Sequence, residues 1–538
     1  MASYAQNDFE ADVDVDGAVD LVVGALESTD YSEDQLAQSY YTQQLQQQQQ
    51  QELASIAPEV RSLIVYLHQA ILNQNTDAIQ GCISHFYRLT EKFQFPEAEI
   101  VAPLVNDDQN FLTIYRELYF RNIYAKGQPT LEQRFRSYDN YCDLFNFILN
   151  SDGPVNLDLP NQYCDSIVDE FVWQFSSFAQ YRARLSKKSE EDITILRENP
   201  QIWSCYSVLN VLYSLIQKSR INEQLAAIKK GENPNDVAGE YGVLPLYRQL
   251  GYCSLIGLLR VHTLLGDFTL ALKMLDNVDI KKSPFARVPN CHFQTYYYQG
   301  FAYMMLHRYA DAIESFIHIL VFISRTKQYH NRSAQYEQVN KKADQVHALL
   351  AICVALCPTR LDENTHSALR EKFGEQLARM SRGGPEALPI FEELFTFAAP
   401  KFINPVPPAD PENVAEPLQH HQKIFMEGVK GQMWAATLRS YMKLYTTMKL
   451  EKLAAFLEID EEELRSQLLV YKQNSRQFRR TEGALLNGEV VSTSELDFSL
   501  EGDIIHIAEA KTGRRYGDWF MRNATKYLQI NEGLAKKH

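Results

Sequence analysis

Two cysteines and a histidine lie close together along the chain and have the residue types for metal binding or nucleophilic chemistry. Cys353 and Cys357 are four residues apart, which places them on one face of a helix, and His347 precedes them. A zinc site needs two further ligands at suitable spacing, and none is evident. The segment HALLAICVALC is apolar, so we expect core thiols here. His420 and His421 are adjacent and would point apart on a helix, which disfavours a shared metal.

The cysteines as a group are scattered among apolar residues, which indicates reduced, buried thiols in a cytoplasmic protein. They are Cys82, Cys142, Cys164, Cys205, Cys253, Cys291, Cys353 and Cys357. The sequence contains no GxSxG, HExxH or kinase signature, and KTGRRYG (511–517) lacks the order of a phosphate loop. We therefore predict no catalytic residues, no cofactor and no metal.

A group of basic residues near the C-terminus has the chemistry for phosphate contacts. Residues 465–538 hold 12 Lys/Arg against 9 Asp/Glu, which is a small surplus for phosphate neutralisation. A solvated helix end is the favoured interpretation, and contact with ribosomal RNA or an acidic neighbour protein is the alternative. The group consists of Lys472, Arg476, Arg479, Arg480, Arg514 and Arg515.

The charge of the whole chain is concentrated at its N-terminus. Its formal net charge is −15, but residues 1–60 hold 12 Asp/Glu and no Lys or Arg, so the remaining 53 Lys/Arg face 56 Asp/Glu. This nearly neutral body argues against nucleic-acid binding driven by net charge. Residues 1–55, which include the run Gln46–Gln51, are predicted to be a disordered acidic and Gln-rich tail. The run around Leu255 to Leu265 contains Arg260 and His262 and does not read as a membrane span.

Helical periodicity dominates the chain after residue 56. Apolar residues recur at helical spacing in stripes that we interpret as seams between stacked helices. One such stripe is Ile167, Phe171, Phe175 and Phe178.

A second pattern matches the tetratricopeptide unit, in which small residues let paired helices approach closely. It consists of Gly300, Tyr303, Tyr309, Ala312 and Phe316. The sequence therefore predicts a right-handed, TPR-like helical stack.

The C-terminal segment changes character. Three short helices are predicted, the first through Leu438, Met442, Leu444 and Tyr445 and the third after Asp460. Glu463 lies three residues after Asp460, which is the spacing of a capping box. Apolar and polar residues then alternate through a β-hairpin that turns at 501–503, and an amphipathic helix follows over 516–534. This order is that of a winged-helix unit followed by a C-terminal helix.

A helical stack that runs into a winged helix resembles the PCI domain, which is found in the proteasome lid, the signalosome and initiation factor 3. Several segments resemble the subunit L family of eukaryotic translation initiation factor 3. These segments are FPEAEIVAPLV (95–105), LYFRNIYAK (118–126), LEQRFRSYDNYCDLFNFIL (131–149), DEFVWQFSSFAQYR (169–182), VAGEYG (237–242), TYYYQGFAYMMLHRYADAI (295–313), RSYMKLYTTMKLEKLAAFL (439–457) and DIIHIAEAKTGRRYGDWF (503–520). The resemblance covers about residues 56–538.

The resemblance implies a non-catalytic scaffold subunit of a cytoplasmic complex that binds the small ribosomal subunit and supports mRNA recruitment. It places subunit K as a direct neighbour and other PCI subunits such as E nearby, with no membrane association. It also implies docking through the wing and the last helix. The candidate interface residues are Leu496, Phe498, Leu500, Ile505, Ile507, Tyr516, Trp519 and Phe520.

The predicted domains are the tail 1–55, a helical-repeat region 56–300, a PCI domain 301–512 and a C-terminal helix and tail 513–538. Within the PCI domain, 301–435 is helical and 436–512 is the winged helix. Three alternatives remain: a PCI scaffold subunit of the proteasome lid or signalosome, a thiol hydrolase, and a direct nucleic-acid reader. The thiol hydrolase requires a cysteine with a lowered pKa near a histidine.

Overall fold

The structure is a computed structural model of the 538-residue chain. It describes residues 53, 55–185, 188–278, 288–330, 335–406, 416–481, 483–494, 496–509 and 514–535. The predicted tail 1–55 lies outside this part of the chain apart from Leu53 and Ser55. The domain boundaries given above stay predictions.

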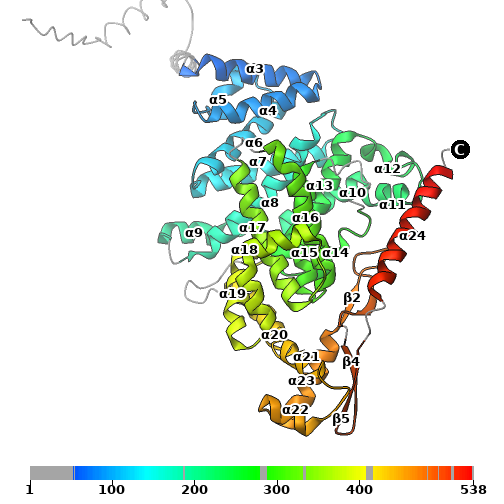
Figure 1. Cartoon of the computed structure of the whole chain (residues 1–538). Helices are drawn as coiled ribbons and strands as arrows, with labels where there is room; N and C mark the ends of the chain where they lie inside the picture. The colour runs from blue at the N-terminus through cyan, green and yellow to red at the C-terminus, as the bar shows by residue number, and fades with distance from the viewer. Residues whose placement is uncertain are drawn as a thin grey trace, which may run out of the picture.

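The described part of the chain is a long stack of helices that leads into a small helical and β unit (Figure 1). This order confirms the predicted fold class. The helices before residue 266 are α3 (Pro58–Leu72), α4 (Thr76–Thr90), α5 (Ala98–Val101), the 3-10 helix η1 (Ala102–Val105), α6 (Gln109–Lys126), α7 (Leu131–Asn150), α8 (Asn161–Ala183), α9 (Glu190–Glu198), α10 (Cys205–Ser219), α11 (Ile221–Lys230), α12 (Asn235–Gly242) and α13 (Pro245–Leu265). The stack continues with α14 (Phe268–Lys273), α15 (Pro289–Met305), α16 (Tyr309–His330), α17 (Gln335–Leu356), α18 (Glu363–Arg382), the 3-10 helix η3 (Pro385–Ala387), α19 (Leu388–Ala398) and α20 (Pro417–Lys430).

The helix ends follow local sequence signals. Thr130 and Gln133 form a reciprocal capping box at the start of α7. The side chain of Asp108 accepts hydrogen bonds from two backbone amides at the start of α6, and Asp362 accepts one at the start of α18. Pro245 occupies the first position of α13. An N–H at this position has no partner within the helix, so proline loses no hydrogen bond there.

Helix α13 lies at the centre of the stack, since it packs against α8, α10, α14 and α15. It is buried along nearly its whole length, which explains an apolar run that continues around the helix. Arg260 within that run is buried and forms an ion pair with Asp169 of α8. None of the described helices is both long enough and apolar enough to cross a bilayer.

The predicted tetratricopeptide-like pair is formed by α15 and α16. Gly300 lies so close to Phe316 that a Cβ atom added to it would be 2.6 Å from the ring carbon Cε1. Tyr303, Tyr309 and Ala312 are buried in the same seam. The glycine therefore permits the close approach of the two helices, as the pattern predicted.

The winged-helix unit has its own apolar core, separate from that of the stack. Its elements are α21 (Ala435–Met442), β1 (Thr447–Lys449), α22 (Leu450–Leu457), α23 (Glu461–Asn474), β4 (Leu496–Glu501) and β5 (Ile504–Glu509). The three strands form an antiparallel sheet in the order β1-β5-β4. Gly502 has a φ of +59°, which lets the chain turn between β4 and β5.

Three local predictions in this unit are corrected by the structure. The helix α21 ends at Met442, so Leu444 and Tyr445 lie outside it, and Leu444 is exposed. Asp460 stands at the N-cap of α23 but its side chain makes no hydrogen bond to the helix, so the capping box is absent. Three glutamates in the first turn, 461–463, provide the negative charge that favours this helix end.

The third correction concerns the basic segment after α23, which is a strand and not a helix end. Strand β2 (Arg476–Arg479) pairs with β3 (Glu489–Ser492) in an antiparallel hairpin. The β2–β3 loop, residues 480–488 without residue 482, reaches back to the helical stack. Leu485 of this loop is buried in the core of the stack.

Hydrogen bonds fasten the β2–β3 loop to α15 and to the start of α16. The carbonyl oxygen of Leu485 accepts hydrogen bonds from the Tyr303 hydroxyl at 2.9 Å and from Nη1 of Arg308 at 3.1 Å. Arg308 also donates to the carbonyl oxygens of Leu486 and Asn487, at 3.0 and 3.3 Å. One arginine of the stack thus binds three consecutive carbonyls of the loop.

Arg308 is held in turn by Asp311, whose carboxylate Oδ2 lies 2.6 Å from its Nη2. The same carboxylate accepts a hydrogen bond from the backbone N–H of Arg480 at 3.0 Å. The side chains of Arg308 and Asp311 are only 8% and 3% exposed. The pair is therefore a buried ion pair within the stack, and both of its members hold the β2–β3 loop.

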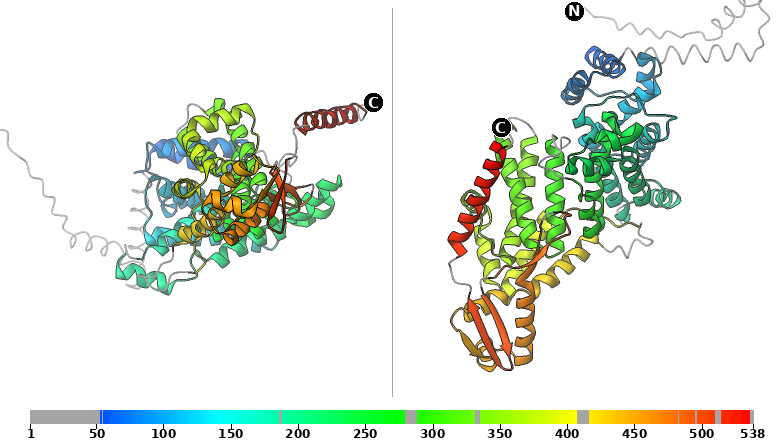
Figure 2. Two further views of the ribbon diagram at one scale, coloured as in Figure 1. Left: turned by 60° about the horizontal axis from the view of Figure 1, so that its bottom comes forward. Right: turned by 90° about the vertical axis from the view of Figure 1, so that its right-hand side faces the viewer.

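The last helix, α24 (Arg514–Ala535), agrees with the predicted amphipathic helix over 516–534. It projects away from the body, as the left view of Figure 2 shows.

Candidate protein-interaction surfaces

Helix α24 presents a broad row of large apolar side chains to solvent. Phe520, Tyr527, Ile530 and Leu534 follow one another at helical spacing, which places them on one face. Seven large apolar side chains are described on this helix, and their exposed fractions lie between 46% and 71%. We call this set the α24 apolar face; it consists of Trp519, Phe520, Met521, Tyr527, Leu528, Ile530 and Leu534. Exposed apolar surface of this extent is typical of a protein interface.

The predicted interface residues divide into two groups. Leu496, Phe498 and Ile505 are buried inside the winged-helix unit, where they pack against α21, α22 and α23. Leu500 and Ile507 are partly buried against the same core.

Trp519 and Phe520 are exposed on α24, and the side chain of Tyr516 lies outside the described part of the chain. Among the predicted interface residues whose side chains the structure describes, Trp519 and Phe520 are therefore the most accessible to a partner.

The outer edge of β4 is partly covered by side chains of the unit itself. The backbone N–H of Phe498 donates to the carboxylate of Asp497 at 2.8 Å, and its carbonyl oxygen accepts a hydrogen bond from Lys472. The backbone N–H of Leu496 donates to the hydroxyl of Ser494 at 3.2 Å. A strand added beside β4 would have to displace these contacts.

The six predicted basic residues do not act as one cluster. Lys472 lies 3.4 Å from Asp497 and is bound within the wing. Arg476, Arg479 and Arg480 are exposed along and just after β2.

The side chains of Arg514 and Arg515 lie outside the described residues. The interpretation of Arg476, Arg479 and Arg480 as an RNA or acidic-partner contact stays a prediction.

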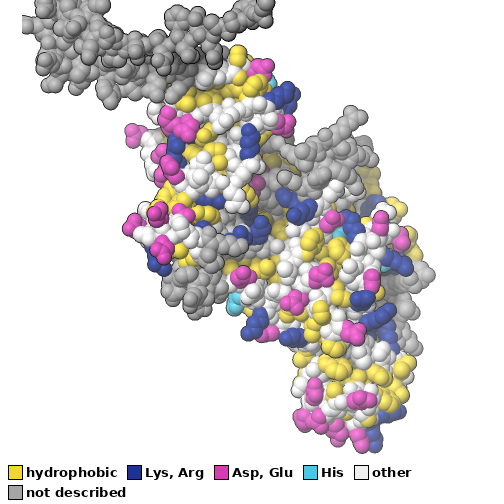
Figure 3. Space-filling model, turned by 90° about the vertical axis from the view of Figure 1, so that its left-hand side faces the viewer, with side chains coloured by type: hydrophobic (Ala, Val, Ile, Leu, Met, Phe, Trp, Pro, Cys, Tyr) yellow, Lys and Arg dark blue, Asp and Glu magenta, His cyan; other side chains and the backbone are white. Residues whose placement is uncertain are grey.

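Helix α23 occupies the position that enters the major groove in DNA-binding winged helices. It is described over its full length and carries two cations, Arg465 and Lys472. Nη2 of Arg465 lies 2.5 Å from Oδ1 of Asp503, and Lys472 forms an ion pair with Asp497. Both positive charges are therefore compensated within the unit. Acidic side chains gather at the end of the molecule formed by this unit (Figure 3), and the first turn of α23 holds three glutamates. This charge pattern disfavours the reading of a nucleic-acid duplex.

The cysteines lack the environment of a nucleophile. Six of the eight are buried, and Cys142 and Cys205 are half-buried. The pKa of all eight cysteine thiols is raised. Burial is the largest cause in six of them. In Cys253 and Cys291 the hydrogen bond between the two thiols has a larger effect than burial. A thiol hydrolase needs a cysteine with a lowered pKa, so this alternative loses its support.

The most buried carboxylate of the stack is engaged by its own neighbours. Glu117 of α6 is 1% exposed and forms an ion pair with Arg121 of the same helix. It accepts hydrogen bonds from the hydroxyls of Tyr141 on α7 at 3.1 Å and Tyr163 on α8 at 2.8 Å. This group ties three helices together, and its charge is compensated inside the protein.

The described chain is thus a helical-repeat and winged-helix protein with a large exposed apolar face. Residues 133–527 match the family described as "RNA polymerase I-associated factor PAF67". The chain belongs to the family of subunit L of eukaryotic translation initiation factor 3, because relatives of that name match most of its length.

Three of these relatives come from fungi. The relative from Mycosarcoma maydis is 53% identical over 503 residues, which cover 90% of this chain and 75% of the relative. The relative from Aspergillus niger is 60% identical over 406 residues, 74% of this chain and 85% of the relative. The relative from Neurospora crassa is 59% identical over 413 residues, 75% of this chain and 87% of the relative. The predicted resemblance is therefore confirmed, and the chain is a translation initiation factor subunit.

Proposed function

We propose that this chain is a non-catalytic, cytoplasmic scaffold subunit of the initiation factor 3 complex. In this role it binds other PCI subunits and supports recruitment of the small ribosomal subunit and of mRNA. Subunit K and PCI subunits such as E are the proposed neighbours. The α24 apolar face is the observation that carries the proposal, because seven large apolar side chains stand exposed on one helix.

The form of this face favours a helical partner. Its residues are spaced three, four and seven positions apart, which suits packing in a groove or between other helices. Aromatic side chains, of which it has three, contribute strongly to binding when a partner covers them. Burial of one such side chain stabilises a complex by about 1.5–3 kcal/mol.

The winged-helix unit contributes a second, weaker surface. Its edge at β4 has the geometry for sheet extension once the side chains of Asp497, Lys472 and Ser494 release its backbone. The exposed apolar side chains Phe478 and Val490 are paired across the β2–β3 hairpin and form a small apolar area there. Arg476, Arg479 and Arg480 would add contacts to RNA or to an acidic partner.

Purification of the tagged full chain from cytosol tests the proposal. The wild-type chain should recover initiation factor 3 subunits and small-subunit ribosomal proteins, and proteasome-lid or signalosome subunits in their place would overturn it. The double variant Phe520→Asp/Tyr527→Asp should reduce this recovery at least about tenfold, since two buried aromatics contribute several kcal/mol.

The variant Thr525→Asp/Gln529→Asp is the matched control. It adds the same two charges to the opposite, polar face of α24 and should leave recovery unchanged. Both variants should unfold at the wild-type temperature, because the altered side chains are exposed. Equal recovery with the two variants would refute docking through the α24 apolar face.

A further inference from the structure

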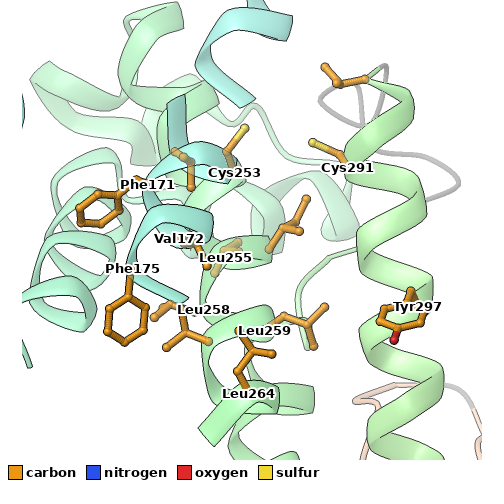
Figure 4. Close-up of a cluster of buried hydrophobic side chains, with 14 of the residues drawn as sticks. Phe171, Val172, Phe175, Cys253, Leu255, Leu258, Leu259, Leu264, Cys291 and Tyr297 are labelled. Atoms are coloured by element: carbon orange, nitrogen blue, oxygen red, sulfur yellow. The ribbon is translucent and has the colours of Figure 1, made fainter. Parts of the chain in front are cut away.

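Three potential metal ligands converge where helices α8, α13 and α15 meet. A carboxylate oxygen of Asp165 and the Sγ atoms of Cys253 and Cys291 all lie within 4.8 Å of one another. Each of the three residues comes from a different helix, and all are buried. Figure 4 shows the sulfur atoms of Cys253 and Cys291 at the gap between α13 and α15. The stack therefore holds two sulfurs and one oxygen in a fixed arrangement.

The carboxylate in this group has neutral partners. Asp165 accepts hydrogen bonds from the Cys291 thiol at 2.8 Å and from the Asn290 amide at 3.1 Å. The neighbouring Arg260 forms its ion pair with Asp169 and not with Asp165. A buried carboxylate without its own cation is costly, and a bound metal ion would compensate its charge.

We propose that Asp165, Cys253 and Cys291 form a binding site for a thiophilic divalent cation, with Zn²⁺ as the best match. Two thiolates and a carboxylate are ligands that zinc accepts, and zinc tolerates three protein ligands with a fourth from elsewhere. The fourth ligand can come from Gln249, whose amide nitrogen lies 3.5 Å from Sγ of Cys253. A flip of this amide presents its oxygen to the ion. A water molecule is the alternative fourth ligand.

Binding exchanges protons for the metal. The S–H bonds of Cys253 and Cys291 break, both protons pass to solvent, and each sulfur donates an electron pair to the ion. The carboxylate of Asp165 gives up the hydrogen bond from Cys291 and takes the ion in its place. Three ligand charges then face the two charges of the ion inside the protein. The site cross-links α8, α13 and α15, and it is independent of the function proposed above.

Zinc content and cobalt spectroscopy of the reduced full chain test the site. The chain purified from zinc-supplemented cells should contain about one zinc ion per molecule. After chelation and refilling with Co²⁺, a charge-transfer absorption from thiolate to cobalt should appear. Cys253→Ser and Cys291→Ser should each abolish this absorption, and Asp165→Asn should weaken zinc binding by about tenfold or more.

The variant Cys353→Ser/Cys357→Ser is the matched control, since it removes two other buried thiols and should retain one zinc and the full cobalt absorption. A wild-type chain that contains no zinc and gives no thiolate–cobalt absorption would overturn the proposal, whether or not the variants fold. Equal loss in the control would also overturn it. So would a disulfide between Cys253 and Cys291 in chain isolated with its thiols trapped, because the pair would then be redox-active and not a ligand pair.

Discussion

Replacement of Arg308 by alanine would detach the β2–β3 loop from the helical stack. The substitution removes the ion pair with Asp311 and the hydrogen bonds to the carbonyl oxygens of Leu485, Leu486 and Asn487. It leaves the carboxylate of Asp311 buried without its cation. Removal of one partner of a buried pair costs about 3–5 kcal/mol. The side chains are nearly inaccessible to solvent, so screening by water does not reduce this figure much.

Hydrogen exchange of backbone amides is the appropriate assay, because a chain with two apolar cores need not unfold in a single step. A cost of about 4 kcal/mol corresponds to about a thousandfold faster exchange, at 1.4 kcal/mol for each factor of ten. The increase should be confined to residues 476–492 and their contacts on α16. Amides of α6, α7 and α8 should exchange at the wild-type rate, since the bonds that hold the β2–β3 loop come from α15, Arg308 and α16.

Arg379→Ala is the control, because Arg379 forms an exposed pair with Glu375 one turn away. Such pairs contribute about 0.3–0.5 kcal/mol, so exchange in 476–492 should not change. The double variant Arg308→Ala/Asp311→Ala should recover part of the loss, because it leaves no buried uncompensated charge. Exchange of 476–492 in Arg308→Ala within about threefold of wild type would refute the view that this ion pair fastens the β2–β3 loop.

Two further predictions concern the helical stack. Gly300→Ala should destabilise the chain by about 1–3 kcal/mol, because the new methyl group would lie 2.6 Å from the Phe316 ring. Gly81→Ala on α4 should instead stabilise the chain by about 0.5–1 kcal/mol, because the added methyl group meets nothing within 4 Å. Thermal unfolding midpoints that shift in the same direction would contradict this assignment. Burial raises the pKa of Glu170 to about 7. Between about pH 4.5 and pH 7 the folded chain therefore retains a proton that the unfolded chain releases. The stability that this group contributes is lost as the pH rises through this range. The thermal unfolding midpoint of the wild type, relative to that of Glu170→Gln, should therefore decrease as the pH rises from about 5 to about 7.5. A midpoint difference that does not depend on pH would contradict this prediction.

The helices and the order of the winged-helix unit were predictable because hydrophobic periodicity encodes them locally. Gly300 and Phe316 indicated a close helix pair, and the structure places them in contact. The strand β1 was missed because it has only three residues, and its sheet partner β5 lies more than fifty residues away. The β2–β3 hairpin was missed because its side chains are mostly exposed and show no alternating pattern. Its position depends on contacts with α16 that no local pattern contains.

The candidate site residues were less predictable than the fold. Alternation marked Leu496, Phe498 and Ile505 as one apolar face, but it does not reveal whether a partner or the same unit covers that face. Sequence proximity drew attention to Cys353 and Cys357, whereas the cysteines that approach an acid are Cys253 and Cys291. Asp165, Cys253 and Cys291 lie 88 and 38 residues apart along the chain, so only the folded stack brings them together.

The α24 apolar face has a consequence for the synthesis of the protein. A newly made copy carries this uncovered helix from the moment it leaves the ribosome, whatever the state of the rest of the fold. Copies produced in excess of their partners would meet one another through the same seven side chains, or would occupy chaperones. Docking through this helix, as proposed above, would therefore give cells a reason to match the output of this chain to that of its partners, and to degrade the surplus.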